Sequence, residues 1–143
     1  MKNIYTWAAQ PAQRNITVGE IIAAKGKKVL TQVTANNALE AKAAEEAGFD
    51  MIIGSAYNVK KVREGSKKLF YTAALELHNY PTAEDVLRGA FTALEKGADA
   101  VMTARSMDIV SMLAKEDVPV MGHLGLVPRT STWIGGLRAV GKT

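Results

Sequence analysis

The chain has no cysteine among its 143 residues. This absence excludes a disulfide framework, a thiolate zinc site and a cysteine nucleophile, and it suits a reducing cytoplasm. No apolar run approaches the roughly 20 residues that a membrane helix needs, and the first 15 residues lack the apolar core of a signal peptide. We therefore expect a cytoplasmic protein without a membrane partner.

A strong charge of one sign is missing as well. Eighteen basic and 14 acidic residues give a net charge of +4, and the small basic clusters at residues 25–28 and 60–68 are typical of solvated loops. We therefore expect no nucleic-acid partner. With 48% hydrophobic and 22% charged residues, the composition is that of a soluble globular domain.

Segments with strand-like and helix-like patterns alternate along the chain. Runs rich in apolar and β-branched residues predict strands at 28–35, 49–54, 69–77, 98–103 and 118–126. Amphipathic or alanine-rich runs predict helices at 18–25, 37–47, 81–96 and 107–115, with glycine at several of their ends. Residues 55–68 have no clear periodicity, so we interpret them mostly as a loop or a short irregular helix.

This alternation predicts a parallel α/β sheet with right-handed crossovers. The phrases AAEEAGFDMII and ALEKGADAVM repeat one helix-Gly-x-Asp-strand unit, as (β/α) barrels often do. We therefore favour a parallel TIM-type barrel over an open sheet. A complete barrel takes about 250 residues, so only its first five strands are expected here. We expect residues 1–143 to form a single barrel domain, the rest of which lies beyond this sequence or comes from another chain.

Polar side chains at the carboxyl ends of the strands are the candidate site, because barrel enzymes place their catalytic groups there. His123 can hydrogen-bond a substrate oxygen or transfer a proton, and Glu76 can act as a base or metal ligand. Arg105 and Ser106 can bind a substrate carboxylate. For His123 the alternative is a core histidine bonded to a backbone carbonyl, and for Arg105 it is a surface salt bridge.

Two further groups follow the first two predicted strands. Ser55 and Tyr57 offer hydroxyl groups to a pocket, or else belong to turn chemistry. Asn36 and Asn37 can face the same pocket, but Asn37 is favoured as a helix N-cap. The pattern GLRAVGKT at 136–143 fits a phosphate loop, yet no buried strand precedes it, so we do not expect that function.

Residues 118–143, VPVMGHLGLVPRTSTWIGGLRAVGKT, closely resemble the ketopantoate hydroxymethyltransferase (3-methyl-2-oxobutanoate hydroxymethyltransferase) family. The segments ITVGEIIAAKGKKVLTQVTA, AKAAEEAGFDMIIG and YPTAEDVLRGAFTALEKGADAV resemble it more weakly. The resemblance implies a barrel of the phosphoenolpyruvate/pyruvate superfamily. It also implies a magnesium ion that holds a 2-oxo acid, and transfer of a one-carbon unit from methylenetetrahydrofolate.

The chain departs from the family at the metal site. Ser55 stands where the family has a metal-binding Asp after its second strand, and Ala74 stands where a second such Asp ends the third strand, with Glu76 two residues on. Residues 101–106 (VMTARS) lack the Lys and Glu of the family's fourth strand, whereas His123 is retained from its substrate-contacting set. We assign no metal ligands, and the cofactor stays open.

The resemblance therefore implies a divergent hydroxymethyltransferase-like enzyme. It would act on a small 2-oxo acid or related carboxylate, with formation or cleavage of a carbon–carbon bond. One alternative is a metal-independent lyase or isomerase of the same superfamily, and another is a non-catalytic barrel for binding or assembly. Because an incomplete barrel leaves sheet edges unpaired, we also expect a homo-oligomer unless the chain is longer.

Overall fold

The central sheet of the computed structural model, which describes residues 1–141, has five parallel strands. In spatial order they are β3 (Gln32–Thr34), β4 (Met51–Ser55), β5 (Phe70–Ala74), β6 (Ala100–Thr103) and β7 (Val120–Gly122). Spatial order follows chain order without a reversal, as in the wall of a barrel and unlike a doubly wound sheet. All five predicted strands are confirmed, most of them shorter than predicted.

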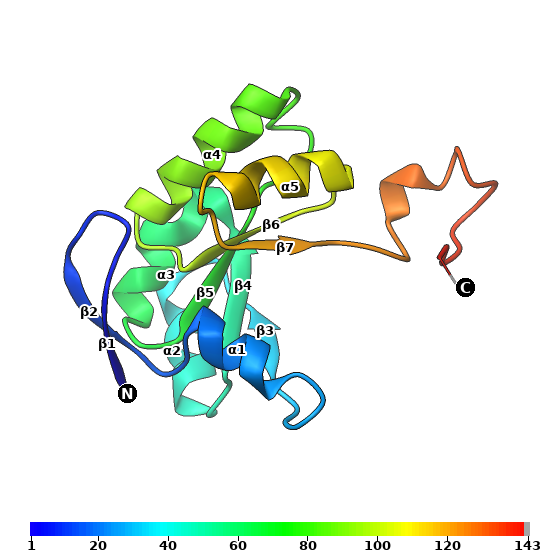
Figure 1. Ribbon diagram of the computed structural model, residues 1–143. Helices are drawn as coiled ribbons and strands as arrows, with labels where there is room; N and C mark the ends of the chain where they lie inside the picture. Colours follow the sequence, from blue (N-terminus) through cyan, green and yellow to red (C-terminus); the bar gives the residue numbers. More distant parts are fainter. Residues whose placement is uncertain (142–143) are drawn as a thin grey trace.

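The helices are α1 (Val18–Ala24), α2 (Ala38–Glu46), α3 (Val59–Gly65), α4 (Ala83–Glu95) and α5 (Met107–Lys115), with 3-10 turns η1 (Ala56–Asn58) and η2 (Pro128–Thr130). Helices α2 to α5 connect the strands of the sheet as crossovers, and α1 precedes the first of these strands (Figure 1). No helix in residues 1–141 is long and apolar enough to cross a membrane. After β7 the chain leaves the body of the domain (Figure 1).

Two parts of the prediction need correction. Residues 59–65, interpreted mostly as loop, form the regular helix α3, because Val59 and Val62 lie one turn apart and are both fully buried. The basic residues between and after these valines make the apolar periodicity of the helix hard to recognise in the sequence. The amino-terminal lead-in contains an antiparallel hairpin, β1 (Lys2–Tyr5) and β2 (Pro11–Arg14), which was not predicted.

The two faces of the sheet are covered differently. Side chains such as Ile52, Tyr71 and Val101 pack with the crossover helices in the main core. Their neighbours along the strands point to the opposite face, where Met51 and Phe70 pack with residues around α1 in a smaller cluster at the amino ends of the strands. The crossover helices thus cover one face, and the small cluster covers only the amino end of the other.

The repeated Gly-x-Asp phrase fastens the amino ends of neighbouring strands. Asp50, just before β4, accepts hydrogen bonds from the Thr31 backbone N–H (2.8 Å) and hydroxyl (2.9 Å), just before β3. Asp99, just before β6, accepts one from the Tyr71 backbone N–H in β5 (2.9 Å). Hydrogen bonding to Thr31 is the main cause that lowers the pKa of Asp50.

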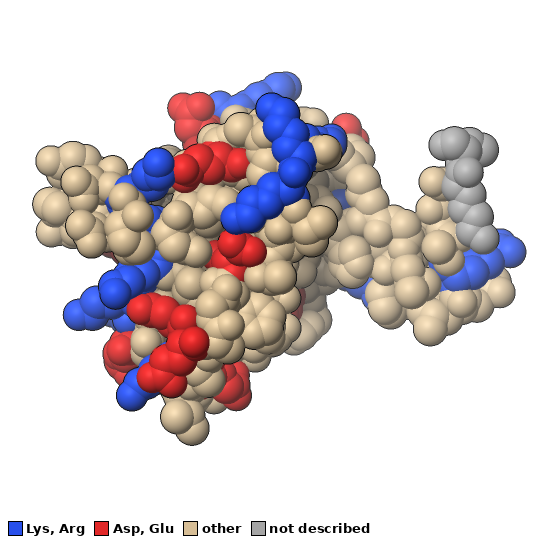
Figure 2. All heavy atoms as spheres, turned by 90° about the horizontal axis from the view of Figure 1, so that it is seen from below, with Lys and Arg blue, Asp and Glu red and all other residues tan. Residues whose placement is uncertain are grey.

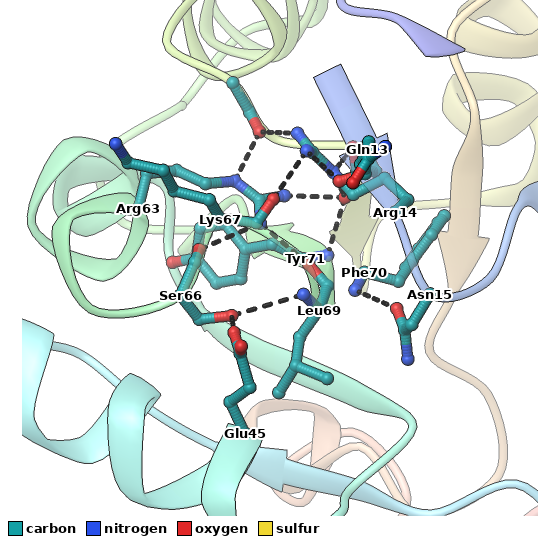
Figure 3. Close-up of polar contacts among 12 residues, drawn as sticks. Gln13, Arg14, Asn15, Glu45, Arg63, Ser66, Lys67, Leu69, Phe70 and Tyr71 are labelled. Atoms are coloured by element: carbon teal, nitrogen blue, oxygen red, sulfur yellow. Dashed lines mark hydrogen bonds and ion pairs between the residues drawn. The ribbon is translucent and has the colours of Figure 1, made fainter. Parts of the chain in front are cut away.

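Asp99 also carries two ion pairs, with Arg14 and Arg63, whose side chains are labelled in Figure 3. Arg14 of the hairpin donates its Nε to the carboxylate at 2.7 and 2.9 Å, and Arg63 of α3 donates an Nη at 2.6 Å. The three side chains are only 5%, 12% and 9% exposed for Arg14, Arg63 and Asp99. One carboxylate therefore joins the hairpin, α3 and two strands.

We predict that Asp99→Asn lowers the free energy of unfolding by about 3–5 kcal/mol, because it leaves two buried guanidinium groups without their counter-charge. Asp50→Asn is the matched control, because it occupies the same place in the repeated phrase but is 24% exposed beside Lys28. We expect it to cost about 1 kcal/mol. Chemical denaturation of both variants measures the difference, and equal losses would contradict the central role of Asp99.

Candidate functional site

The carboxyl ends of β4 to β7 lie side by side in register. Ser55 pairs with Ala74, Ala74 with Met102, and Met102 with Met121, so these residues form one row across the sheet. Glu76 follows Ala74 by two residues, and His123 follows Met121 by two. Since side chains alternate along a strand, Glu76 and His123 lie on the same face of the sheet as this row, two residues beyond it.

Ser55 is held from three sides. Its backbone N–H donates to the Asn36 side-chain oxygen (2.9 Å), which also accepts from the Asn58 amide (3.3 Å). Its carbonyl accepts from the Tyr71 hydroxyl (2.8 Å), and its own hydroxyl accepts from the Tyr57 backbone N–H (3.2 Å). The Ser55 hydroxyl thus takes part in the turn chemistry of η1 and keeps its proton available for donation.

Gly54 explains why the β4 end can approach the β3 end so closely. A Cβ atom at Gly54 would lie 2.2 Å from the Ala35 carbonyl oxygen and 3.0 Å from the Asn36 side-chain oxygen. Only glycine fits without a shift of the backbone. The close approach places Asn36 against the turn that carries Ser55.

Glu76 has a carboxylate oxygen, Oε2, that is buried and has no hydrogen-bond partner among the described residues. Such atoms are rare in proteins, because leaving a buried polar group unpaired is costly. Two tyrosines lie within its electrostatic reach. Burial is the main cause that raises the pKa of Tyr71 and Tyr80, and the charge of Glu76 adds to the rise in both. The free oxygen is suited to accept a proton or a hydrogen bond from a ligand.

Arg105 connects the end of β6 with the loop that follows β5. Its Nη2 donates to the carbonyl oxygens of Leu77 (3.3 Å) and Tyr80, while its Nε is buried without a partner in residues 1–141. The described contacts of Arg105 are thus with backbone carbonyls rather than with a surface carboxylate. Ser106 is exposed at the N-cap position of α5, where its side chain makes no capping hydrogen bond.

Tyr57 and Tyr80 form an aromatic pair beside these loops. Tyr57 is 60% exposed, and the two rings stack with centroids 6.1 Å apart. The Tyr80 ring also lies over Gly89 of α4, where a Cβ atom would come within 2.3 Å of the ring. Both tyrosines line a hollow of about 220 Å³ that also contacts Asn79.

His123 is exposed, and its backbone N–H donates to the Thr103 carbonyl (2.9 Å), which extends the pairing of β6 and β7 by one residue. An exposed position does not match the alternative of a core histidine. The structure thus brings the loops of Ser55, Glu76 and Arg105 together through described contacts. Convergence of His123, Glu76 and Arg105 on one cavity stays a prediction.

The sequence predicts only some of the hydrogen bonds that the asparagines near the strand ends make. Asn37 is confirmed as a helix N-cap, because its side chain accepts from the Glu40 backbone N–H (2.9 Å). The bridging roles of Asn36, Asn58 and Tyr80 were not predicted, because they depend on which strand ends become neighbours.

The phosphate-loop pattern ends at Lys142 and Thr143, which lie outside the described residues.

The donor set of the strand ends does not fit a magnesium site of the kind the resemblance implies. Magnesium prefers carboxylate and other oxygen ligands, and the row itself offers Ser55, Ala74, Met102 and Met121. Glu76 adds one carboxylate. No group of three or more His, Asp or Glu side chains within residues 1–141 is arranged to hold a metal ion.

Comparison with known proteins gives the following matches. The family model described as ketopantoate hydroxymethyltransferase matches residues 53–143. The 3-methyl-2-oxobutanoate hydroxymethyltransferase of Kosmotoga olearia is 33% identical, over 90% of this chain and 57% of the relative. That of Thermotoga neapolitana is 32% identical, over 83% and 53%. This chain thus spans little more than half the length of these relatives.

Two solved structures share the fold. Phosphonopyruvate hydrolase, crystallised with oxalate and Mg²⁺, superposes with a TM-score of 0.51 and 19% identity, over 64% of this chain and 40% of the other. The other is 2,3-dimethylmalate lyase, a member of the phosphoenolpyruvate mutase/isocitrate lyase superfamily. Its TM-score is 0.53 with 13% identity, over 75% and 52%. These likenesses confirm the predicted barrel class, of which this chain carries five strands.

We predict that Asn36→Ala lowers the free energy of unfolding by about 1–3 kcal/mol, because the Ser55 N–H loses its acceptor. Asn36→Asp keeps an acceptor oxygen at the same place and should recover most of this loss. Thermal and chemical denaturation of the two variants measure the effect. Equal destabilisation by both substitutions would show that the oxygen is not what holds the turn.

Proposed function

The chain belongs to the ketopantoate hydroxymethyltransferase family, and from this premise we propose that it is a hydroxymethyltransferase-like enzyme that acts on a small 2-oxo acid. The observation that carries the proposal is the family match, which includes the ends of β4, β5, β6 and β7. The reaction would form or break a carbon–carbon bond next to the 2-oxo group. We place it at the carboxyl ends of the strands.

Glu76 is proposed as the general base. Its buried Oε2 has no described partner, so it can take a proton from the carbon next to the 2-oxo group. This step breaks the C–H bond and leaves its electron pair in an enolate, which is the nucleophile for carbon–carbon bond formation. His123 at the end of β7 is proposed to hydrogen-bond the substrate or to transfer a proton to its oxygen.

The remaining candidates are proposed to bind and orient the substrate. Arg105 and Ser106 would bind its carboxylate, with Arg105 also fixing the loop after Glu76 through the carbonyls of Leu77 and Tyr80. Ser55 would donate its hydroxyl proton to a substrate oxygen. Tyr57 would close the side of the pocket together with Tyr80.

No step of this mechanism passes through a metal ion or a folate. The row itself has no carboxylate and Glu76 beyond it adds only one, which does not fit the magnesium site that the family implies. The hollow beside Tyr57 and Tyr80 is lined mainly by α4 and contacts none of Ser55, Glu76, Arg105, Ser106 and His123, so we do not assign it to the substrate or to a folate.

A metal-independent lyase or isomerase is the second candidate, favoured by the substitutions at Ser55 and Ala74. A non-catalytic binding or assembly barrel is the third. Thermal unfolding with added magnesium tests whether a metal is used, because a ligand that binds only the folded state raises the midpoint. From the donor set at the strand ends we expect no rise, and a rise would overturn the metal-free mechanism above as well as the metal-independent lyase or isomerase.

We also propose a cytoplasmic location, no nucleic-acid or membrane partner, and residues 1–143 as part of one barrel domain. Self-association is proposed because β3 and β7 are the edges of the described sheet, and exposed edges favour pairing with another chain. Light scattering of the protein tests this. A stable monomer near the 15.4 kDa of this sequence would contradict it.

We predict that Glu76→Gln slows exchange of the C3 hydrogen of 3-methyl-2-oxobutanoate for deuterium by about 100-fold or more, because the amide cannot take the proton. Proton NMR in D2O follows this exchange without any one-carbon donor. Glu84→Gln is the control, since Glu84 lies exposed on α4 in a pair with Arg88. It should exchange at the rate of the unchanged protein.

His123→Ala should slow the same exchange far more than it lowers the melting temperature, because an exposed strand-end residue contributes little to the core. Parallel loss of both properties would indicate a structural role for His123. Unchanged exchange in Glu76→Gln would remove Glu76 from the mechanism.

A further inference from the structure

A second hollow lies at the opposite end of the sheet from the proposed site. It measures about 370 Å³ and lies where the hairpin meets the segments that precede β5 and β6. It is lined by Thr6, Pro11, Ala12, Gln13, Arg14, Arg63, Lys67, Lys68 and Gly97. Four of these nine residues are cationic and none is acidic. We call this the basic hollow.

The inner wall of the basic hollow carries a positive charge that the described residues do not neutralise. Arg14 and Arg63 are two buried guanidinium groups, and both pair with the single carboxylate of Asp99. Figure 3 shows the side chains of Arg14 and Arg63 approaching each other in this network. Burial lowers the pKa of Arg63 and the positive charge of Arg14 adds to this effect, while Asp99 opposes it.

Backbone carbonyls compensate part of this charge. Arg14 donates to the Gln13 and Lys67 carbonyls at 3.0 and 2.8 Å, and Arg63 donates to those of Gly97 and Leu69 at 2.8 and 2.7 Å. Carbonyl dipoles hold the guanidinium groups in place but carry no net charge. One full positive charge of the buried trio therefore remains.

The outer wall adds two ammonium groups. Lys67 and Lys68 are exposed, and Lys68 makes a pair with Glu45 at 3.7 Å, in which the Lys68 side chain is 58% and the Glu45 side chain 30% exposed. A single pair of this length with an exposed ammonium group contributes little, so Lys68 can turn toward another anion. The basic hollow thus combines a fixed, buried positive charge with two adjustable cations at its mouth.

We propose that the basic hollow binds the phosphate group of a small phosphorylated compound or inorganic phosphate itself. A phosphate carries close to two negative charges at neutral pH, which matches the charge of the hollow better than a single carboxylate does. Figure 2 shows basic side chains in separate places with acidic ones between them, rather than one continuous basic surface. A local ligand therefore fits better than a nucleic-acid strand.

Calorimetric titration of the full chain with inorganic phosphate, at constant ionic strength, tests the proposal. The variant Lys67→Gln/Lys68→Gln should bind phosphate about tenfold more weakly, because two exposed charge contacts are lost. Its backbone carbonyls, which Arg14 and Asn15 use, remain in place. The control Lys25→Gln/Lys27→Gln changes the net charge equally, outside the hollow, and should bind like the unchanged protein.

The pattern of phosphate binding across the two variants supports or overturns the proposed site. Phosphate binding that falls only in the Lys67/Lys68 variant supports the basic hollow, and glucose 6-phosphate as a second ligand then distinguishes a phosphate ester from the free ion. Equal loss in both variants would show a nonspecific charge effect and overturn the proposal. No phosphate binding would overturn it as well, and so would binding of a single-stranded oligonucleotide alone. The melting temperature of each variant shows that it is folded.

Discussion

The buried carboxylate of Asp99 is the contact on which the arrangement of the sheet depends. It joins Arg14, which lies 85 residues earlier in the chain, to Arg63 in α3 and to the Tyr71 backbone N–H in β5. Removing one partner of such a group leaves a buried charge without its counter-charge, so we expect the packing of all these segments to weaken together. Because this cluster fixes the amino ends of β5 and β6, it also sets which residues meet at their carboxyl ends.

The two ends of the sheet therefore differ in how their polar groups are used. Around Asp99, each guanidinium donates to a carboxylate and to carbonyls, which is typical of groups that stabilise a fold. At the carboxyl ends, Glu76 Oε2 and Arg105 Nε are buried without a partner in the described chain. Unpaired buried groups lower stability, and proteins keep them where a ligand or a reaction needs them. This contrast supports placing the reaction at the carboxyl ends.

Sequence patterns predicted the parts of the fold that depend on local chemistry. The five strands and four of the helices follow from apolar periodicity, and the Asn37 cap follows from residue preference at helix starts. The hairpin and α3 were missed or underestimated, because their stability comes from partners far along the chain. Nothing near Arg14 or Arg63 in the sequence indicates that both contact Asp99, so the sequence alone could not reveal the basic hollow.

The residues of the candidate site were also only partly predictable from the sequence. The family resemblance identifies the strand ends, but it places Ala74 where the family has a carboxylate. Glu76 remains on the same face because side chains alternate along a strand, yet it lies about 6–7 Å further from the sheet centre. A substrate that uses Glu76 must therefore bind further out, near the loop that Arg105 holds through Leu77 and Tyr80. The proposal of Glu76 as the base therefore involves Arg105 as well, because the hydrogen bonds of Arg105 to the Leu77 and Tyr80 carbonyls hold the loop that directly follows Glu76.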